Sequence, residues 1–344
     1  MRIMVTGADG YLGGVVALRF QRRGHSVWGP DAGYFSARSS AAPSAADIRD
    51  LDGSSLAGFD AIVHLAALSN DASAEINRQV CIDINEMQAV RIARLAKEHG
   101  VPRFVFASTC SVYGARHGTA SEDDPVAPLS VYAATKHRAE SRIAGLAADG
   151  FSPVILRLAT LFGASPNMRT DLVINRMVAS AVTRGKVELN GPGTSYRPFL
   201  RVQDAADAIE AAATGGLSTP PRCFNVAAAG GNLLIHQVAR MIQDVLPGVA
   251  AITLDTTPDR RSYAVDTSRL ARAGMQFAID FRHEIAELAA YFVSTGSSYE
   301  ALTAAPADRA ATLAGLLARR EIGADLRWTP TADQAARTLR KQGQ

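Results

Sequence analysis

Cysteine is scarce in this sequence of 344 residues. The three cysteines, Cys81, Cys110 and Cys223, are widely spaced and form no Cys-x-x-Cys motif or Cys/His cluster. This usage argues against a disulfide framework and against a structural zinc site, so we predict no metal. It also indicates a reducing compartment, and we expect a cytoplasmic protein.

Long hydrophobic runs and an excess of one charge are lacking as well. No apolar stretch approaches the length of a membrane span, and a strand-like run follows Met1 directly, which argues against a signal peptide. Lys and Arg number 36 against 33 Asp and Glu, without a basic run or a basic patch interleaved with aromatic residues. Neither a membrane nor a nucleic acid is therefore expected as a partner.

What the sequence does contain is ample material for a buried core, with 47% apolar and 20% charged residues. A chain of this length exceeds one core of ordinary size, so we expect two lobes with a cleft between them. In the first half, short β-branched or aromatic runs alternate with helical patterns, which indicates βαβ units and a parallel sheet. The runs are residues 3–6, 26–28, 61–65, 104–107 and 154–158, and the helical patterns are residues 11–23, 85–99 and 131–145.

The fold class that this alternation predicts is α/β, with a doubly wound parallel sheet and a smaller C-terminal lobe. Residues 1–165 form the sheet domain. Residues 166–344 form mainly the smaller lobe and a helical tail, with a helix at 172–183, and residues 197–225 pack back onto the sheet domain. We assign no chemistry to the Ala- and Arg-rich tail that begins at residue 306. Ligands of such folds bind beyond the carboxyl ends of the strands, so functional residues are expected there.

A glycine-rich turn follows the first strand. Its sequence is Gly7-Ala-Asp-Gly10-Tyr11-Leu12-Gly13, and it opens a helix. Glycines at this spacing permit a tight turn and a close approach of the backbone to a pyrophosphate, and the helix N-terminus supplies N–H donors. The turn therefore predicts a Rossmann-type dinucleotide site. The alternative is a strand-to-helix turn with a purely structural role.

Asp31 follows the second strand, about twenty residues beyond the glycines, where a carboxylate can accept hydrogen bonds from an adenosine ribose. A carboxylate there also repels a 2′-phosphate, so NAD is favoured over NADP. The alternative is an aspartate in an ordinary turn, which the sequence Asp-Ala-Gly would suit.

Tyr132 and Lys136 lie four residues apart on a predicted helix, so their side chains share one face. A tyrosine is a poor base at neutral pH, but a neighbouring ammonium favours its phenolate. In isolation the pair would fit an amphipathic helix with a half-buried Tyr and a snorkelling Lys. Here it follows Ser108-Thr109-Cys110-Ser111-Val112-Tyr113-Gly114 at a suitable distance, and this joint pattern indicates a catalytic pair.

Taken together, these motifs resemble the extended short-chain dehydrogenase/reductases of the NAD-dependent epimerase/dehydratase family, over roughly residues 1–280. The resemblance implies that Thr109 hydrogen-bonds the reacting carbinol, that Tyr132 is the base and that Lys136 binds the nicotinamide ribose. It implies a structural or relay role for Asn85. It also implies a homodimer formed through the helices at 85–99 and 131–145.

The resemblance extends to further ligand contacts. For the cofactor, NAD, it implies that Asp47 and Ile48 cap the adenine. It implies a nucleotide-sugar substrate, whose diphosphate faces Arg197 and Arg261, because the planar fork of arginine binds phosphate oxygens bidentately. This chain has Arg197-Pro-Phe where the family often has Arg-Asp-Phe. The remaining residues expected to line the site are Leu65, Ala66 and Ala67 for the cofactor and Ser69, Cys110, Ser111, Thr160 and Asn175 for the substrate.

The two residues after Thr109 bear on the reaction. The related dehydratases and decarboxylases commonly carry a carboxylate there to move protons at C5 and C6, whereas this chain has Cys110-Ser111. A 4-epimerase, which passes through a transient 4-keto sugar, is therefore the preferred interpretation. The alternatives are a dehydratase that uses the Cys110 thiolate, a net NAD-dependent reductase or dehydrogenase and, less favoured, a non-catalytic NAD-binding protein.

Overall fold

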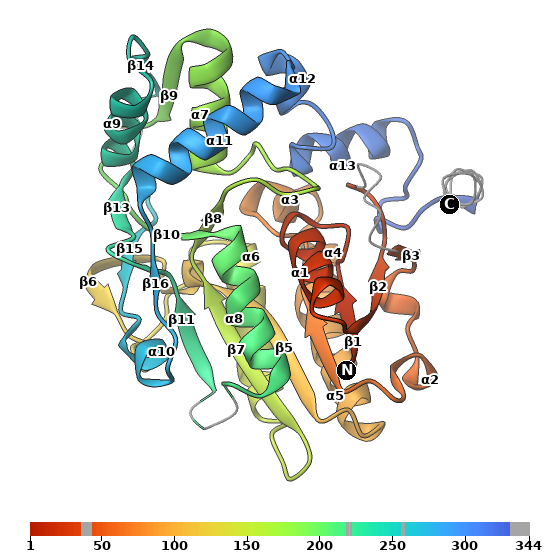
Figure 1. The fold of residues 1–344 in the computed structure, drawn as a ribbon. Coiled ribbons are helices and arrows are strands. Elements are labelled where there is room, and N and C mark those ends of the chain that lie inside the picture. The colour runs from red at the N-terminus through yellow and green to blue at the C-terminus, as the bar shows by residue number, and fades with distance from the viewer. Residues whose placement is uncertain (36–42, 218–219, 221, 256–258, 331–344) are drawn as a thin grey trace.

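A parallel seven-stranded sheet organises the computed structural model, which describes residues 1–35, 43–217, 220, 222–255 and 259–330 (Figure 1). Its strand order is β11-β7-β5-β4-β1-β2-β3, and every neighbouring pair is parallel. The strands are β1 (Arg2–Thr6), β2 (Ser26–Asp31), β3 (Pro43–Ala45), β4 (Ala61–His64), β5 (Arg103–Thr109), β7 (Ser152–Leu158) and β11 (Cys223–Val226). The predicted α/β class with a doubly wound parallel sheet is confirmed.

Alternating residues of these strands enter two different hydrophobic clusters, because successive side chains of a strand point to opposite faces. In β5, Val105 packs in the cluster that contains α1 and α8, whereas Phe104 and Phe106 pack in the cluster that contains α5. Burial on both faces explains why these strands read as continuous apolar runs. The helices and helical turns that follow in the first 214 residues are α1 (Tyr11–Arg22), η1 (Ile48–Asp50), α2 (Gly53–Leu56), α3 (Asp71–Ile76), α4 (Arg78–Ile82), η2 (Asp83–Gln88), α5 (Ala89–Glu98), η3 (Cys110–Tyr113), α6 (Val131–Ala144), α7 (Val173–Arg184) and α8 (Val202–Thr214).

The helix predicted at 85–99 differs from the structure at its start. The segment begins as a π-helical turn, η2, and becomes α-helical only in α5. Asn85 lies in this turn, and its side chain bonds both backbone groups of Leu68, as acceptor from N at 2.8 Å and as donor to O at 3.0 Å. A π-turn widens the helix locally and commonly occurs at functional sites. Here it directs Asn85 toward the segment that follows β4.

A third hydrophobic cluster forms the smaller lobe, around α7, α9 and α11, which stand together beyond one end of the sheet in Figure 1. In this cluster Phe281 stacks on Phe162 and meets Phe199 edge to face. Its remaining strands are β6 (Ala115–Ala120), β8 (Thr160–Phe162), β9 (Lys186–Asn190), β10 (Tyr196–Arg201), β12 (Ala228–Ala229), β13 (Asn232–Leu234), β14 (Ala250–Asp255), β15 (Ser262–Val265) and β16 (Phe277–Ala278), and its helices are α9 (Ile235–Val245), α10 (Ser268–Arg272) and α11 (Phe281–Thr295).

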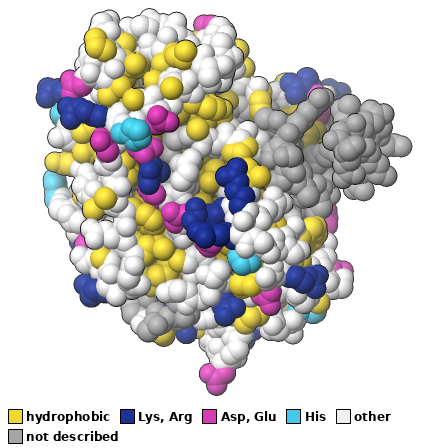
Figure 2. All heavy atoms as spheres, in the orientation of Figure 1, with side chains coloured by type: hydrophobic (Ala, Val, Ile, Leu, Met, Phe, Trp, Pro, Cys, Tyr) yellow, Lys and Arg dark blue, Asp and Glu magenta, His cyan; other side chains and the backbone are white. Residues whose placement is uncertain are grey.

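Segments distant in sequence return to the large sheet. α8 packs beside α1, where Arg19 pairs with Asp207 and Glu210, and β11 forms the edge of the sheet next to β7. Basic and acidic side chains lie next to each other on the face drawn in Figure 2. Helix α12 (Tyr299–Thr303) precedes the tail. The tail, with α13 (Arg309–Ala318), then lies on the side of the sheet on which β2 and β3 lie (Figure 1). Within the described ranges, every helix is too short or too polar to span a bilayer.

Candidate active site

One pocket runs along the carboxyl ends of the strands, between the sheet and the smaller lobe. It receives residues from the turn after β1, the end of β2, the segments after β4 and β5, helix α6, strand β8 and, unexpectedly, the tail. The predicted site residues that line it are Gly7, Gly10, Tyr11, Leu12, Gly13, Asp31, Asp47, Ile48, Leu65, Ala66, Ala67, Ser69, Thr109, Ser111, Tyr132, Lys136, Thr160 and Arg261. The topology therefore brings together motifs that are spread over about 250 residues.

The glycine turn approaches the neighbouring backbone so closely that side chains would not fit. Gly7 has φ +75°, and a Cβ built on it would lie 2.8 Å from the Ala66 nitrogen. A Cβ on Gly13 would lie 1.9 Å from the Gly7 carbonyl oxygen. Because the turn is built from glycines, no side chain covers the backbone at the start of the twelve-residue helix α1. The N–H groups and the dipole of such a helix N-terminus attract a phosphate. The observed geometry fits a dinucleotide.

Asp31 is held in place by two backbone N–H groups. Its Oδ2 accepts a hydrogen bond from the Asp9 nitrogen at 3.0 Å, and its Oδ1 accepts one from the Gly33 nitrogen at 2.6 Å. The carboxylate therefore stands at a defined position of the pocket wall, next to the glycine turn. Asp47 lines the same end, and its carboxylate pairs with Arg49 at 2.5 Å.

The residues predicted to be catalytic meet in the middle of the pocket. Ser130 caps α6 by accepting a hydrogen bond from the Ala133 nitrogen at 3.2 Å, and the helix then presents Tyr132 and Lys136 on one face. Burial raises the pKa of Tyr132 above its ordinary value, and the neighbouring Thr109 side chain offsets only part of this rise. Lys136 donates to the Ala107 carbonyl oxygen at 2.9 Å, and burial lowers its pKa to about 8.

Arg261 is the predicted diphosphate ligand that faces the pocket. Asp259 accepts from Arg261 at 2.7 Å and from Arg197 at 2.6 Å, so the two arginines share one carboxylate. Arg261 also pairs with Asp71 across the pocket. Arg197 is buried and does not line the pocket, because its guanidinium bonds Asp259 and the backbone oxygens of Tyr196 and Arg261. It positions Arg261 through Asp259.

Two more residues expected to contact substrate lie outside the pocket wall. Cys110 is 1% exposed, and its thiol donates to the Arg157 carbonyl oxygen at 3.1 Å, away from the pocket. Burial raises the pKa of this thiol, so the thiolate needed for the Cys110 dehydratase hypothesis is disfavoured. Asn175 is fully buried and accepts from the Gly163 nitrogen at 3.0 Å while donating to the Arg169 carbonyl oxygen at 2.8 Å, which gives it a structural position.

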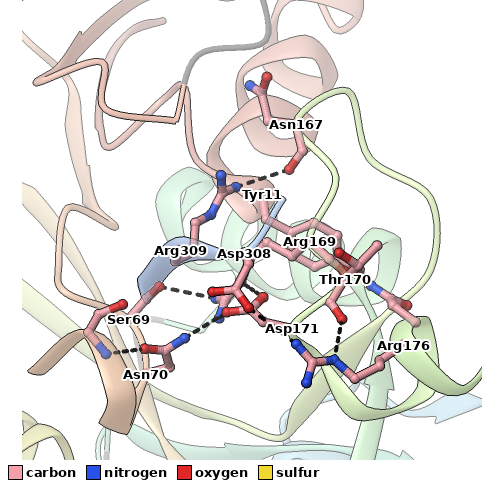
Figure 3. A network of polar contacts seen from close by, with 12 residues as sticks. Tyr11, Ser69, Asn70, Asn167, Arg169, Thr170, Asp171, Arg176, Asp308 and Arg309 are labelled. Atoms are coloured by element: carbon pink, nitrogen blue, oxygen red, sulfur yellow. Dashed lines mark hydrogen bonds and ion pairs between the residues drawn. The ribbon is translucent and has the colours of Figure 1, made fainter. Parts of the chain in front are cut away.

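Several lining residues were not singled out from the sequence. Arg169 forms a bidentate pair with Asp171, at 2.8 and 2.9 Å, and donates to Ser69 Oγ at 3.0 Å (Figure 3). Tyr263 is buried, with its hydroxyl 3.0 Å from Ser111 Oγ. Arg309 reaches the pocket from the tail. No local motif surrounds these residues, since each is brought to the pocket by the packing of a segment distant in sequence.

With this geometry established, the chain can be compared with known proteins. A model of the NAD dependent epimerase/dehydratase family matches residues 3–227. The chain belongs to this family. The predicted family, enzyme class and cofactor NAD are thereby confirmed, and the glycine turn, Asp31 and the Tyr132–Lys136 pair fit the cofactor that the family uses.

Two similar family members have different activities. The dTDP-glucose 4,6-dehydratase of Streptomyces griseus is 30% identical over 257 residues, which span 73% of this chain and 76% of that protein. The UDP-glucose 4-epimerase of Corynebacterium glutamicum is 29% identical over 269 residues, which span 71% of this chain and 80% of that protein. Membership of the family is thus compatible with both the epimerase and the dehydratase interpretation.

Solved structures show the same fold. MoeE5, determined in complex with UDP-glucose and NAD, has a TM-score of 0.74 and 27% identity, and the match covers 86% of this chain and 100% of MoeE5. The NAD-dependent NDP-hexosamine 5,6-dehydratase TunA has a TM-score of 0.77 and 25% identity, with 85% of this chain and 98% of TunA covered. In both comparisons this chain contains residues that the other protein lacks.

Proposed function

We propose that this family member is a nucleotide-sugar 4-epimerase in which Tyr132 is the base and Thr109 orients the reacting hydroxyl. The support is their shared position in the pocket, where the Thr109 side chain lowers the pKa of the Tyr132 phenol against the rise that burial causes. Tyr132 accepts the proton of the sugar 4-hydroxyl as the carbinol becomes a ketone. The keto sugar then rotates in the pocket and presents its opposite face to the cofactor. Tyr132 returns the proton to the C4 oxygen, and the product has the inverted configuration at C4.

Positive charge is needed to make the half-buried Tyr132 a base. Lys136 supplies an ammonium on the same face of α6, held by the Ala107 carbonyl oxygen. Bound NAD supplies the hydride acceptor, and the same hydride returns to the sugar, so the cycle has no net redox change. The glycine turn, Asp31 and Lys136, which all line the pocket, would hold the cofactor.

The other end of the pocket suits a nucleoside diphosphate. Arg261 is oriented by Asp259 and Asp71, and a phosphate would meet its planar fork there. Ser69, Ser111 and Thr160 line the intervening wall and offer hydroxyl groups to a sugar.

The observation that carries the choice of epimerase lies directly after Thr109. Cys110 is buried and turned away, and Ser111 bonds the Tyr263 hydroxyl, so neither provides the acid or base that an elimination requires. Among the described lining residues the carboxylates belong to aspartates only. One of them, Asp71, forms an ion pair with Arg261. Dehydration remains the second candidate, because relatives of comparable similarity catalyse it.

The deciding experiment is incubation of the protein and NAD with a panel of UDP-, GDP-, CDP- and dTDP-sugars. Product stereochemistry is followed by NMR and free NADH by absorbance. We expect inversion at C4 without accumulation of NADH. Loss of water would establish the dehydratase, and a stoichiometric change in NADH would establish a reductase or dehydrogenase.

Substitution of Cys110 by serine is expected to change turnover by less than about fivefold, since the thiol does not reach the pocket and a single neutral hydrogen bond is worth about 1 kcal/mol. Steady-state kinetics on the sugar identified by the panel would measure this. A loss of turnover of a hundredfold or more, with the melting temperature unchanged, would restore a chemical role for the thiol.

The proposal also includes a homodimer formed through η2–α5 and α6, as the family resemblance implies, and a cytoplasmic location, as the cysteine usage indicates. Sedimentation equilibrium would test the dimer.

A further inference from the structure

The tail covers the adenosine end of the pocket. Trp328 Nε1 donates to the Ala32 carbonyl oxygen at 2.7 Å, one residue beyond Asp31, and its ring lies 5.7 Å from that of Tyr34. The Tyr34 hydroxyl bonds the Leu326 carbonyl oxygen in return. These contacts attach residues 326–328 of the tail to the loop that follows Asp31.

Apolar burial shows that this attachment is part of the core. Leu313, Leu316, Ile322 and Leu326 are each at most 5% exposed, and they pack in the same cluster as Met4 of β1 and residues of α5. Burial of a leucine or isoleucine side chain stabilises by about 1.5–3 kcal/mol. The tail is therefore an integral layer over the sheet domain.

Arg309 is the one residue of α13 that reaches the pocket wall among those described. It is 2% exposed, donates to the carbonyl oxygens of Pro306 at 2.7 Å and Asn167 at 3.2 Å, and lies over the Phe35 ring at 4.4 Å. Figure 3 shows its side chain directed toward Asn167. Within the described ranges it forms no ion pair, although a buried cation normally requires one.

The neighbours of Arg309 locate it at the cofactor end. Phe35 follows Asp31 in the same loop, and Asn167 lies against Gly14 in the first turn of α1, where a built Cβ would be 3.4 Å from its side-chain nitrogen. Arg309 therefore stands between the ribose-binding carboxylate and the helix that the glycine turn opens. Burial, and next the Arg169 cation, lower the pKa of Arg309 to about 9, although Asp171, Asp31 and Asp308 act in the opposite direction. A phosphate next to the guanidinium would stabilise its charged form further.

We propose that Arg309 binds the pyrophosphate of NAD, and that the tail thereby holds the cofactor in the protein through successive turnovers. A guanidinium has five N–H donors, and carbonyl oxygens engage only part of its fork, so donors remain for phosphate oxygens. The diphosphate of the sugar nucleotide is the less suitable anion, because its candidate ligand, Arg261, stands with Ser111 and Tyr263 on the substrate side. Retention of the cofactor suits a reaction that returns its hydride in every cycle. The inference rests on the family's use of NAD and is independent of whether the sugar is epimerised or dehydrated.

The test is calorimetric titration of the cofactor-free full chain with ADP-ribose, which carries the pyrophosphate, and with adenosine, which does not. Arg309→Met is expected to weaken ADP-ribose binding by about 10- to 100-fold, the range for a charged hydrogen-bonded contact. Adenosine binding is expected to change by less than about twofold. The salt dependence of ADP-ribose binding should also become shallower in the variant, because one fewer cation faces the phosphates.

Two further variants separate binding from folding. Arg319→Met changes an exposed arginine just beyond the same helix, whose partner is Glu321, and should leave both affinities unaltered. Arg309→Lys retains the charge and should recover part of the ADP-ribose affinity. Equal losses for ADP-ribose and adenosine would show that Arg309 only supports the fold, and unaltered ADP-ribose binding would show that it does not contact the pyrophosphate. Either result overturns the inference, whereas the product assay alone decides the proposed reaction.

Discussion

Replacement of Tyr132 by phenylalanine is expected to lower kcat by about 10²- to 10⁴-fold, the usual contribution of a positioned acid or base. The change removes one hydroxyl from a ring that lines the pocket and leaves the ring itself in place, so the fold and the affinity for NAD should be retained. NMR assays of samples quenched at successive times would measure kcat, and calorimetric titration would measure the affinity for NAD.

The pH dependence provides a second signature of the same residue. Because the phenol must lose its proton to act as base, wild-type turnover should rise with pH, and the residual turnover of Tyr132→Phe should be nearly independent of pH. Tyr196→Phe is the matched control, since Tyr196 is 43% exposed and lies outside the pocket wall. Full activity in Tyr132→Phe would refute the proposed mechanism.

Replacement of Glu140 by alanine is expected to lower the free energy of unfolding by about 3–5 kcal/mol, because it leaves a buried arginine without its partner. Glu140 and Arg157 are 4% and 6% exposed, and their closest N–O distance is 2.9 Å. Ser108 also bonds Glu140, and Arg157 donates to the Tyr113 hydroxyl at 2.9 Å. The pair thus joins α6, which carries Tyr132, to strands β5 and β7. Denaturant titration would measure the loss.

The effect should depend on pH. Burial by itself raises the pKa of Glu140, but the neighbouring His137 ring and the hydrogen bonds from Arg157 outweigh burial and hold the pKa below its ordinary value. The stabilisation is therefore present above the ordinary carboxyl pKa, and it is lost as the pH falls through the lower pKa of the folded state. The difference between wild type and Glu140→Ala should shrink accordingly on acidification.

An exposed ion pair offers the control for this prediction. Glu75 and Arg78 pair at 2.6 Å on the surface, with side chains 45% and 68% exposed, so Glu75→Ala should cost at most about 1 kcal/mol. A double variant that replaces both Glu140 and Arg157 by apolar residues should recover part of the stability lost in Glu140→Ala. Equal stability losses for Glu140→Ala and Glu75→Ala would contradict the assigned role of the buried pair.

Much of the pocket was predictable because its motifs are local. The glycine turn depends on residues that are three apart, and Tyr132 and Lys136 share a face because four residues make about one helical turn. The order of strands and helices then places these motifs at one edge of the sheet. Periodicity also predicted most element bounds to within a few residues, as for α1 and α6. The π-turn before α5 was missed, because nothing in its apolar spacing distinguishes it from an α-helix.

The sequence by itself therefore determined the fold class and the cofactor, and it placed Tyr132 and Lys136 on one helix face, since each of these depends on short-range spacing. Only the tertiary structure decided which way Cys110 points, which of Arg197 and Arg261 faces the pocket, and that the tail supplies Arg309. Arg309 and its partner Asn167 are 142 residues apart, and no periodicity extends that far. Contacts of this kind arise from the packing of whole segments, which is set by the sum of buried apolar surface and not by any one motif.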